Sequence, residues 1–181
     1  MIKEPLGSFI SQSFFSRTND MTTKYAYFAG GCFWGVEYFF SKHAGVVKVL
    51  SGFMGGHIKE PTYHEVCYCE TGHLEVVQVE YDPNVVSYET LAKLFFEIHN
   101  PEQTNGQGPD IGSQYLSAVF VSNEEEKNII QNLIKILTEK GLHVATKILE
   151  KKEFYAAEEY HQNYYQKNGK TPYCHKKVSR F

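Results

Sequence analysis

The stretch AGGCFWGVEYFF, residues 29–40, decides the fold of this chain. It follows the apolar run YAYF (25–28), which is typical of a short strand. From about Phe33 to Ser41 the apolar positions recur at helical spacing. Gly30 and Gly31 lie between the two patterns and indicate a tight turn. The stretch therefore predicts a strand, a glycine turn and a helix in direct succession.

The rest of the chain continues this alternation. We expect strands over residues 46–53, 73–82, 115–122 and 142–149, and helices over 87–99, 122–140 and 156–167. Residues 54–72 and 100–114 are expected to be loops. The order β-α-β-β-α-β with an appended α-β-α predicts an α+β fold, a two-layer α/β plait in which helices pack on a mixed sheet.

Two of the expected helices carry capping signals. Ser87 is in position to cap the helix over residues 87–99. Ser122 and Glu125 have the spacing of a capping box for the next helix, which should run to about Lys140 and end at Gly141.

Composition limits the class of protein. The chain has 181 residues, of which 42% are hydrophobic and 22% charged, as in an ordinary globular domain. Its net charge of −3 gives no basic field for nucleic acid or anionic lipid, and no apolar run approaches a membrane span. We expect one domain over residues 21–181, a monomer, preceded by a flexible extension over residues 1–20 that is not a signal peptide. Four cysteines are too few for a disulfide scaffold, so we expect a cytoplasmic protein.

Cys32 is the first candidate for chemistry. At a helix N-terminus, free N–H groups and the helix dipole favour a thiolate, so we expect a pKa below the ordinary value of about 8.5. Gly30 and Gly31 should let a substrate reach the sulfur. One of the rings of Phe33 and Trp34 can face the core while the other lines an opening. The alternative is an inert buried thiol, but the strand–glycine–helix context favours a nucleophile.

GCFWG (31–35) resembles the signature of the peptide methionine sulfoxide reductase A family. Further blocks resemble that family in the same order: GFMGG (52–56), PTYHEVC (61–67), TGHLEVVQVEYDP (71–83), QGPDIGSQY (107–115) and AEEYHQNYY (157–165). The likeness covers roughly residues 24–175. It implies reduction of methionine sulfoxide, free and in oxidised proteins, with preference for the S epimer at sulfur. It also implies thiolate attack, a sulfenic acid and an intramolecular disulfide, without a bound cofactor or metal, and recycling by thioredoxin.

Glu75 matches the family's catalytic glutamate. Strand alternation places it on the same face as Val77, Val79 and Tyr81, which is the more apolar face. Desolvation there would raise the pKa of the carboxyl and make it a proton donor for the sulfoxide oxygen. The alternative is a glutamate at a strand end that turns into water.

The resemblance assigns five more residues near the substrate. Tyr63 and Tyr115 are expected to donate hydrogen bonds to the sulfoxide oxygen, because a phenol keeps its proton at neutral pH. Asp110 resembles the family's second carboxylate, although an aspartate that forms a turn is the alternative. Phe33 and Trp34 should hold the S-methyl group.

Cys174, in the polar tail, matches the family's resolving cysteine. To form a disulfide, its Cα must come within about 7 Å of that of Cys32, which a flexible tail would allow. Three positions depart from the family pattern. Leu116 stands where arginine is usual, Phe53 where tyrosine is common, and Cys69 where glycine is usual.

A zinc site is the main alternative. His64, Cys67, Cys69 and His73 fall close together in sequence, with His57 nearby, and all can bind zinc. The C-x-C spacing is not that of a zinc ribbon, and Cys32 would then have no role. A third possibility is a non-catalytic module that binds oxidised peptides in an aromatic cleft. The roles of Cys67 and Cys69 in thiol exchange stay open.

Overall fold

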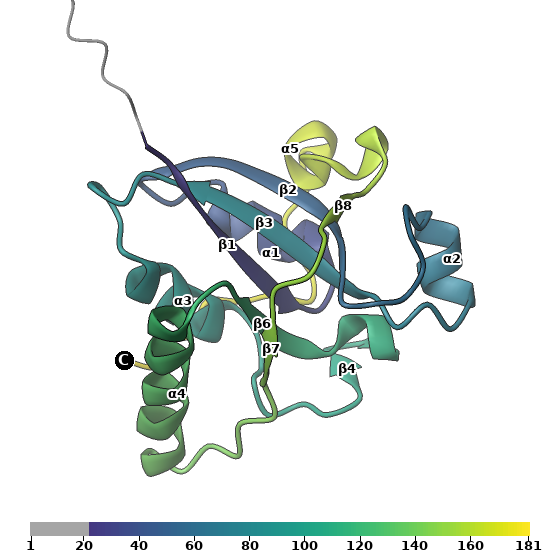
Figure 1. The fold of residues 1–181 in the computed structure, drawn as a ribbon. Helices are drawn as coiled ribbons and strands as arrows, with labels where there is room; N and C mark the ends of the chain where they lie inside the picture. The colour runs from purple at the N-terminus through teal and green to yellow at the C-terminus, as the bar shows by residue number, and fades with distance from the viewer. Residues whose placement is uncertain (1–21) are drawn as a thin grey trace, which may run out of the picture.

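A six-stranded sheet organises residues 22–181, the part of the chain that the computed structural model describes (Figure 1). The strand order is β7-β6-β1-β3-β2-β8. The strands are β1 (Lys24–Gly30), β2 (Val46–Met54), β3 (Leu74–Tyr81), β6 (Ser117–Val121), β7 (Lys147–Glu150) and β8 (Tyr155–Ala156). Only the β6–β7 pair is parallel, so the sheet is mixed, as predicted. The expected N-terminal extension, residues 1–20, lies outside the described residues.

Helices cover mainly one face of this sheet. They are α1 (Phe33–Phe40), α2 (Tyr63–Tyr68), α3 (Tyr88–Ile98), α4 (Glu124–Glu139) and α5 (Tyr164–Asn168). The ring of Phe28 in β1 stacks at 5.0 Å on Phe40 of α1 and at 5.2 Å on Phe95 of α3. In Figure 1, α4 lies beside α3, and its buried residues Ile130 and Leu133 join the same apolar core. The fold class is therefore confirmed.

The opposite face of the sheet carries a smaller apolar cluster around Met54, Val76 and Phe120, against which Phe154 packs. A short ribbon, β4 (Gly106–Gln107) and β5 (Asp110–Ile111), and the 3₁₀ turn Ser113–Tyr115 lead into β6. Among residues 22–181, no helix has both the length and the apolar character to cross a bilayer.

Strand register brings one end of each of three neighbouring strands, β1, β3 and β6, to the same end of the sheet. Gly30, the last residue of β1, pairs with Ser117, the first residue of β6. Phe28 of β1 pairs with Val77 of β3. Because the β1–β3 pair is antiparallel, the start of β3, with Glu75, lies at the same edge as the end of β1. Residues that flank these three ends are therefore held close together.

The predicted capping box of α4 is wrong by one residue. Asn123, not Ser122, is the N-cap, and its side chain accepts the N–H of Glu126. The carboxylate of Glu126 in turn accepts the N–H of Ser122, so Glu126 takes the part expected of Glu125. Asparagine is as good a cap as serine, and the sequence offered both registers. The Ser87 cap of α3 is confirmed.

Two expected elements near the C-terminus also need correction. The strand expected over residues 142–149 is shorter, because the N–H of Ala145 bonds to the carbonyl of Pro101 instead of joining the sheet. The helix expected over residues 156–167 is wrong. Its first residue, Ala156, belongs to β8, a 3₁₀ turn follows, and Asn163 has a left-handed φ of 53°, so a helix forms only at α5, Tyr164–Asn168.

Helix α2 was not expected, since residues 54–72 were predicted as a loop. The Thr62 side chain accepts the N–H of Glu65, and the Glu65 carboxylate accepts the N–H of Thr62 at 2.8 Å. This is a complete capping box, and the T-x-x-E spacing would have revealed it. The short helix carries Tyr63 toward the end of the sheet where the three strand ends meet.

The capping assignment of α4 predicts a stability change. Asn123→Ala should lower the free energy of unfolding by about 1 kcal/mol, because it leaves the N–H of Glu126 without its partner. Asn128→Ala, the same substitution at an exposed interior position of α4, is the control and should not destabilise the protein. Urea unfolding measures both variants. Equal loss in both would contradict the assignment of Asn123 as the cap.

Candidate active site

Cys32 occupies the junction that the sequence predicted. It is the N-cap residue of α1, directly after β1, and only 6% of it is exposed. Gly31 has a left-handed φ of 89°, which explains the glycine before the cysteine. The expectation that this glycine opens a path to the sulfur is wrong. The side chain of Gln107 fills the space where a Cβ on Gly31 would lie.

The pKa of Cys32 is shifted in the direction opposite to the expectation. Interaction with the Cys174 thiol, followed by burial, raises the pKa of the Cys32 thiol well above its ordinary value. A hydrogen bond from the backbone of Trp34 lowers the pKa, as expected at a helix N-terminus, but it is the smaller effect. With the tail in place, Cys32 is therefore a neutral thiol. Movement of Cys174 away from it would favour ionisation.

Glu75 lies against the start of α1. Its Oε2 accepts the N–H of Phe33 at 3.0 Å, while its Oε1 is buried and has no hydrogen-bond partner in the structure. Only 1% of the residue is exposed. Burial, with a further contribution from Cys32, raises the pKa of this carboxyl well above its usual range. Burial thus favours the protonated form of the Glu75 carboxyl, and its free oxygen is placed to act on a bound substrate.

The two tyrosines converge near this carboxyl. Burial raises the pKa values of both Tyr63 and Tyr115, so both hydroxyls keep their protons. Burial raises the pKa of Cys67, one turn after Tyr63 on α2, and interaction with the hydroxyls of Tyr63 and Tyr115 partly offsets that increase. The cysteine of PTYHEVC thus lies beside the two donors. Cys69 is exposed at the end of α2.

The two rings after Cys32 have different environments. Phe33 is 1% exposed and packs against Phe53 and Tyr63, with ring centroids 5.7 and 6.1 Å apart. Trp34 is only partly buried and stacks on Tyr164 of α5 at 3.7 Å. One ring therefore faces the core and the other the surface, as the sequence suggested. Trp34 also lines a surface cleft between α1 and α5 whose lining does not include Cys32.

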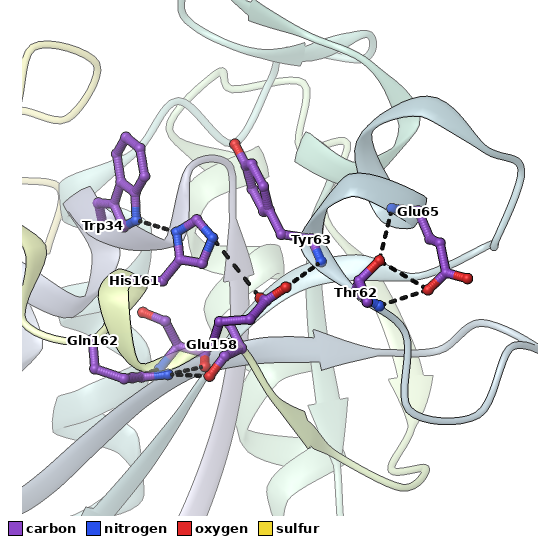
Figure 2. Close-up of polar contacts among 9 residues, drawn as sticks. Trp34, Thr62, Tyr63, Glu65, Glu158, His161 and Gln162 are labelled. Atoms are coloured by element: carbon purple, nitrogen blue, oxygen red, sulfur yellow. Dashed lines mark hydrogen bonds and ion pairs between the residues drawn. The ribbon is translucent and has the colours of Figure 1, made fainter.

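A polar chain fixes both the Trp34 ring and the Tyr63 helix, as Figure 2 shows. The indole N–H of Trp34 donates to Nδ1 of His161 at 3.1 Å. Nε2 of His161 lies 3.9 Å from the carboxylate of Glu158, which accepts the N–H of Tyr63. Sequence reasoning did not single out His161 or Glu158, although both belong to AEEYHQNYY. Both stand on the turn that replaces the expected helix.

The C-terminal tail lies over Cys32. The sulfur atoms of Cys32 and Cys174 and a carboxylate oxygen of Asp110 lie within 4.8 Å of one another. Both cysteines are free thiols. The hydroxyl of Tyr173 donates to Asp110 at 3.2 Å. Asp110 therefore contacts the tail residue that precedes Cys174.

Beyond Cys174 the tail is fixed on α3. The N–H of Val178 donates to the carbonyl of Glu97, and the guanidinium of Arg180 donates to the carbonyl of Phe96, both at 2.8 Å. The segment expected to be a flexible arm is thus anchored on both sides of the cysteine.

The residues of the alternative zinc site do not gather. Within residues 22–181, none of His57, His64, Cys67, Cys69 and His73 belongs to a group of three or more side chains placed to share one ion. Cys67 instead contacts the two tyrosines.

The departures from the family pattern have local explanations. Leu116 packs on the apolar cluster around Met54. Phe53 is fully buried and pairs with Glu75 across β2 and β3, so its ring helps to keep water from the carboxyl.

Comparison with known proteins agrees with this geometry. The sequence profile described as "Peptide methionine sulfoxide reductase" matches residues 24–181. The chain belongs to the peptide methionine sulfoxide reductase family. A relative from Sulfolobus acidocaldarius, described as peptide methionine sulfoxide reductase MsrA, is 47% identical over 146 residues, which cover 80% of this chain and 83% of that protein. The resemblance drawn from the sequence is confirmed.

Solved structures of this reductase family share the fold. The crystal structure of Mxr1 from Saccharomyces cerevisiae in its reduced form has a TM-score of 0.79 and 34% identity, covering 88% of this chain and 93% of that one. The structure of Mxr1 in complex with Trx2 has a TM-score of 0.57 and 26% identity, covering 86% and 89% of the two chains. A reductase of this family has therefore been captured with a partner protein.

The raised pKa of Glu75 predicts a pH-dependent stability in this reductase. The folded chain holds the proton of Glu75 more tightly than the unfolded chain, whose glutamate has a pKa of about 4.3. Wild-type stability should therefore fall as pH rises above that value. Glu75→Gln removes this loss. The free energy of unfolding of the variant minus that of wild type should therefore increase by up to about 1.4 kcal/mol for each pH unit above about 4.3.

Urea unfolding across the pH range measures this difference. Glu139→Gln, at an exposed position of α4, is the matched control and should show no such trend. If the difference in free energy of unfolding between Glu75→Gln and wild type stays constant with pH, Glu75 is ionised in the folded protein.

Proposed function

We propose that this chain reduces methionine sulfoxide to methionine, with Cys32 as nucleophile and Glu75 as proton donor. The observation that carries the proposal is the buried Oε1 of Glu75, which has no partner and belongs to a carboxyl bonded to the residue after Cys32. A sulfoxide oxygen is a hydrogen-bond acceptor and would satisfy this group. Family membership supports the same reaction.

The substrate fits between the rings and the hydroxyls. The S-methyl group would lie on the exposed part of the Trp34 ring, which Phe33 packs against from the core side, and the sulfoxide oxygen would face Tyr63, Tyr115 and Glu75. Neutral donors suit this oxygen because negative charge develops on it during attack. We propose that the S epimer is the one that satisfies both contacts, for free methionine sulfoxide and for oxidised proteins alike.

The first step moves one oxygen atom and conserves protons. Cys32 sulfur attacks the substrate sulfur, and Glu75 gives its proton to the sulfoxide oxygen. The S–O bond of the substrate breaks, and a bond joins the Cys32 sulfur to the substrate sulfur. The released hydroxyl then bonds to the Cys32 sulfur, the bond between the two sulfurs breaks, methionine leaves, and Cys32 is a sulfenic acid. The proton of the Cys32 thiol passes to the Glu75 carboxylate, so the acid is restored. Because Glu75 gives one proton and takes another, the reaction can start with both Cys32 and Glu75 protonated.

The second step uses Cys174 as the resolving cysteine of the same domain. Its sulfur attacks Cys32, an S–S bond forms, and water is released. The 4.8 Å limit on the separation of the two sulfurs supports this pairing. We propose that Asp110 is the carboxylate that positions the tail for this step, through Tyr173.

Recycling needs an external dithiol. We propose that a thioredoxin reduces the Cys32–Cys174 disulfide, so that the chain works without a bound cofactor or metal. The complex of Mxr1 with Trx2 supports this choice. A monomer in the cytoplasm, where thioredoxin keeps thiols reduced, fits four free cysteines and a net charge of −3.

Cysteine variants separate the two steps. Cys32→Ser should abolish methionine release from a methyl sulfoxide, because no other thiol receives the oxygen. Cys174→Ser should still release one methionine per enzyme but stop under thioredoxin recycling. Cys69→Ser, at an exposed thiol, is the control and should turn over normally. Chromatography of released methionine measures all three variants, and turnover by Cys32→Ser would refute the nucleophile.

The tyrosine hydroxyls predict a graded loss. Tyr63→Phe and Tyr115→Phe should each lower kcat/KM by about a hundredfold, as removal of an oxyanion donor does. Tyr68→Phe, on the same helix as Tyr63 but 78% exposed, is the matched control. Steady-state kinetics with thioredoxin measure the three variants. Unchanged kcat/KM in Tyr63→Phe and Tyr115→Phe would place the sulfoxide oxygen elsewhere.

A further inference from the structure

His175 is a buried residue that the proposed reaction does not yet use. It lies in the tail between Cys174 and the exposed residues Lys176 and Lys177, and only 5% of it is exposed. Its Nε2 lies 2.6 Å from the carbonyl oxygen of Gly30, and its Nδ1 lies 3.0 Å from the sulfur of Cys174. The imidazole thus connects the end of β1 to the resolving thiol.

The start of α1 provides the space for this ring. A Cβ on Gly35 would collide with Nδ1 and the neighbouring ring carbons of His175. Gly35 is helical, so it is not explained by a left-handed backbone. The last glycine of GCFWG is therefore needed in this chain because an imidazole from the tail packs on it. Such a fit holds the ring in one position.

The hydrogen bonds of His175 define its tautomer. A carbonyl oxygen can only accept, so Nε2 carries the hydrogen that Gly30 receives. Burial lowers the pKa of His175, so the ring is neutral and Nδ1 has a free lone pair. The Cys174 S–H is then the donor to Nδ1. The imidazole is oriented to accept a proton from this thiol.

We propose that His175 is the base that deprotonates Cys174 for its attack on oxidised Cys32. The inference rests on the proposed function, because it concerns the second step of that reaction. Nδ1 takes the thiol proton, the Cys174 sulfur forms the S–S bond with Cys32, and the S–O bond of the sulfenic acid breaks. The departing hydroxide receives the proton that His175 took and leaves as water. Atoms, charge and protons balance without a further reactant.

The groups around the ring are compatible with this role. The carboxylate of Asp110 favours the protonated ring, so it would stabilise the imidazolium that forms during the step. His99, at the end of α3, is neutral, since burial lowers its pKa to about 3. Cys32, Tyr165 and Tyr173 are other titratable groups near Cys174. Burial raises the pKa of both tyrosines, and interaction with Cys174, followed by burial, raises that of Cys32. Lys176 and Lys177 are exposed.

The test measures the two steps separately. Wild type and His175→Gln are mixed with one equivalent of a methyl sulfoxide, and methionine release and disulfide formation are followed in quenched samples. Gln can still donate to Gly30 but cannot act as a base. Methionine release should be unchanged. Disulfide formation should slow about a hundredfold at about pH 7, because a positioned general base contributes at least that much to such a step.

The pH profile distinguishes a base from a structural residue. The slowing of disulfide formation in His175→Gln should shrink as pH rises, because hydroxide in solution can then take the thiol proton in place of the imidazole. His143→Gln, at an exposed position, is the matched control and should behave as wild type. A slowing that is constant with pH, or equal disulfide rates in both proteins, would overturn the proposal.

Wild type alone gives a second measurement if the variant does not fold. With His175 as the base, the rate of disulfide formation should be nearly constant between about pH 6.5 and 8, because the imidazole is neutral throughout. A tenfold rise per pH unit would overturn the proposal. Peroxide can oxidise Cys32 in place of the sulfoxide, so failure of methionine release would refute the function and leave this test intact.

Discussion

The hydrogen bond from the N–H of Phe33 to the carboxyl of Glu75, 3.0 Å long, is the interaction on which the site depends. It joins the first turn of α1 to the edge of β3, and so places an acid beside the nucleophile Cys32. Alone, a helix N-terminus would favour the ionised carboxylate and thiolate. Burial outweighs this preference at Glu75, and interaction with Cys174, followed by burial, outweighs it at Cys32. As a result, the Cys32 thiol and the Glu75 carboxyl both favour their protonated forms, and oxygen transfer uses these two protons.

The sheet and the tail supply this site from separate parts of the chain. Antiparallel register fixes the ends of β1, β3 and β6 at one edge, so their flanking residues meet without a long loop. The tail crosses this edge and is held by α3 beyond it. Its cysteine is thus positioned by bonds on both sides. A resolving thiol held in this way meets the sulfenic acid soon after it forms, which limits further oxidation of Cys32.

Sequence patterns predicted the parts of this arrangement that depend on local order. The strand–glycine–helix junction at Cys32, the apolar face that carries Glu75 and the cap at Ser87 all follow from neighbouring residues. The reversed pKa shift of Cys32 could not be foreseen, because it depends on contact with Cys174, far along the chain. Gln107 against Gly31 and His175 against Gly35 are likewise tertiary contacts that periodicity does not encode. The first part of the helix expected over residues 156–167 failed for the same reason, since β2 pairs with Ala156.

The protonation state of Glu75 at neutral pH is the central claim, and it can be measured directly. Glutamate labelled with ¹³C at the carboxyl carbon reports ionisation by NMR, and Glu75→Gln identifies the signal. The account predicts a Glu75 signal that stays in the protonated position through about pH 7, while exposed glutamates titrate near about pH 4.3. A Glu75 signal that titrates together with the exposed glutamates would mean that the acid is absent and would contradict the account.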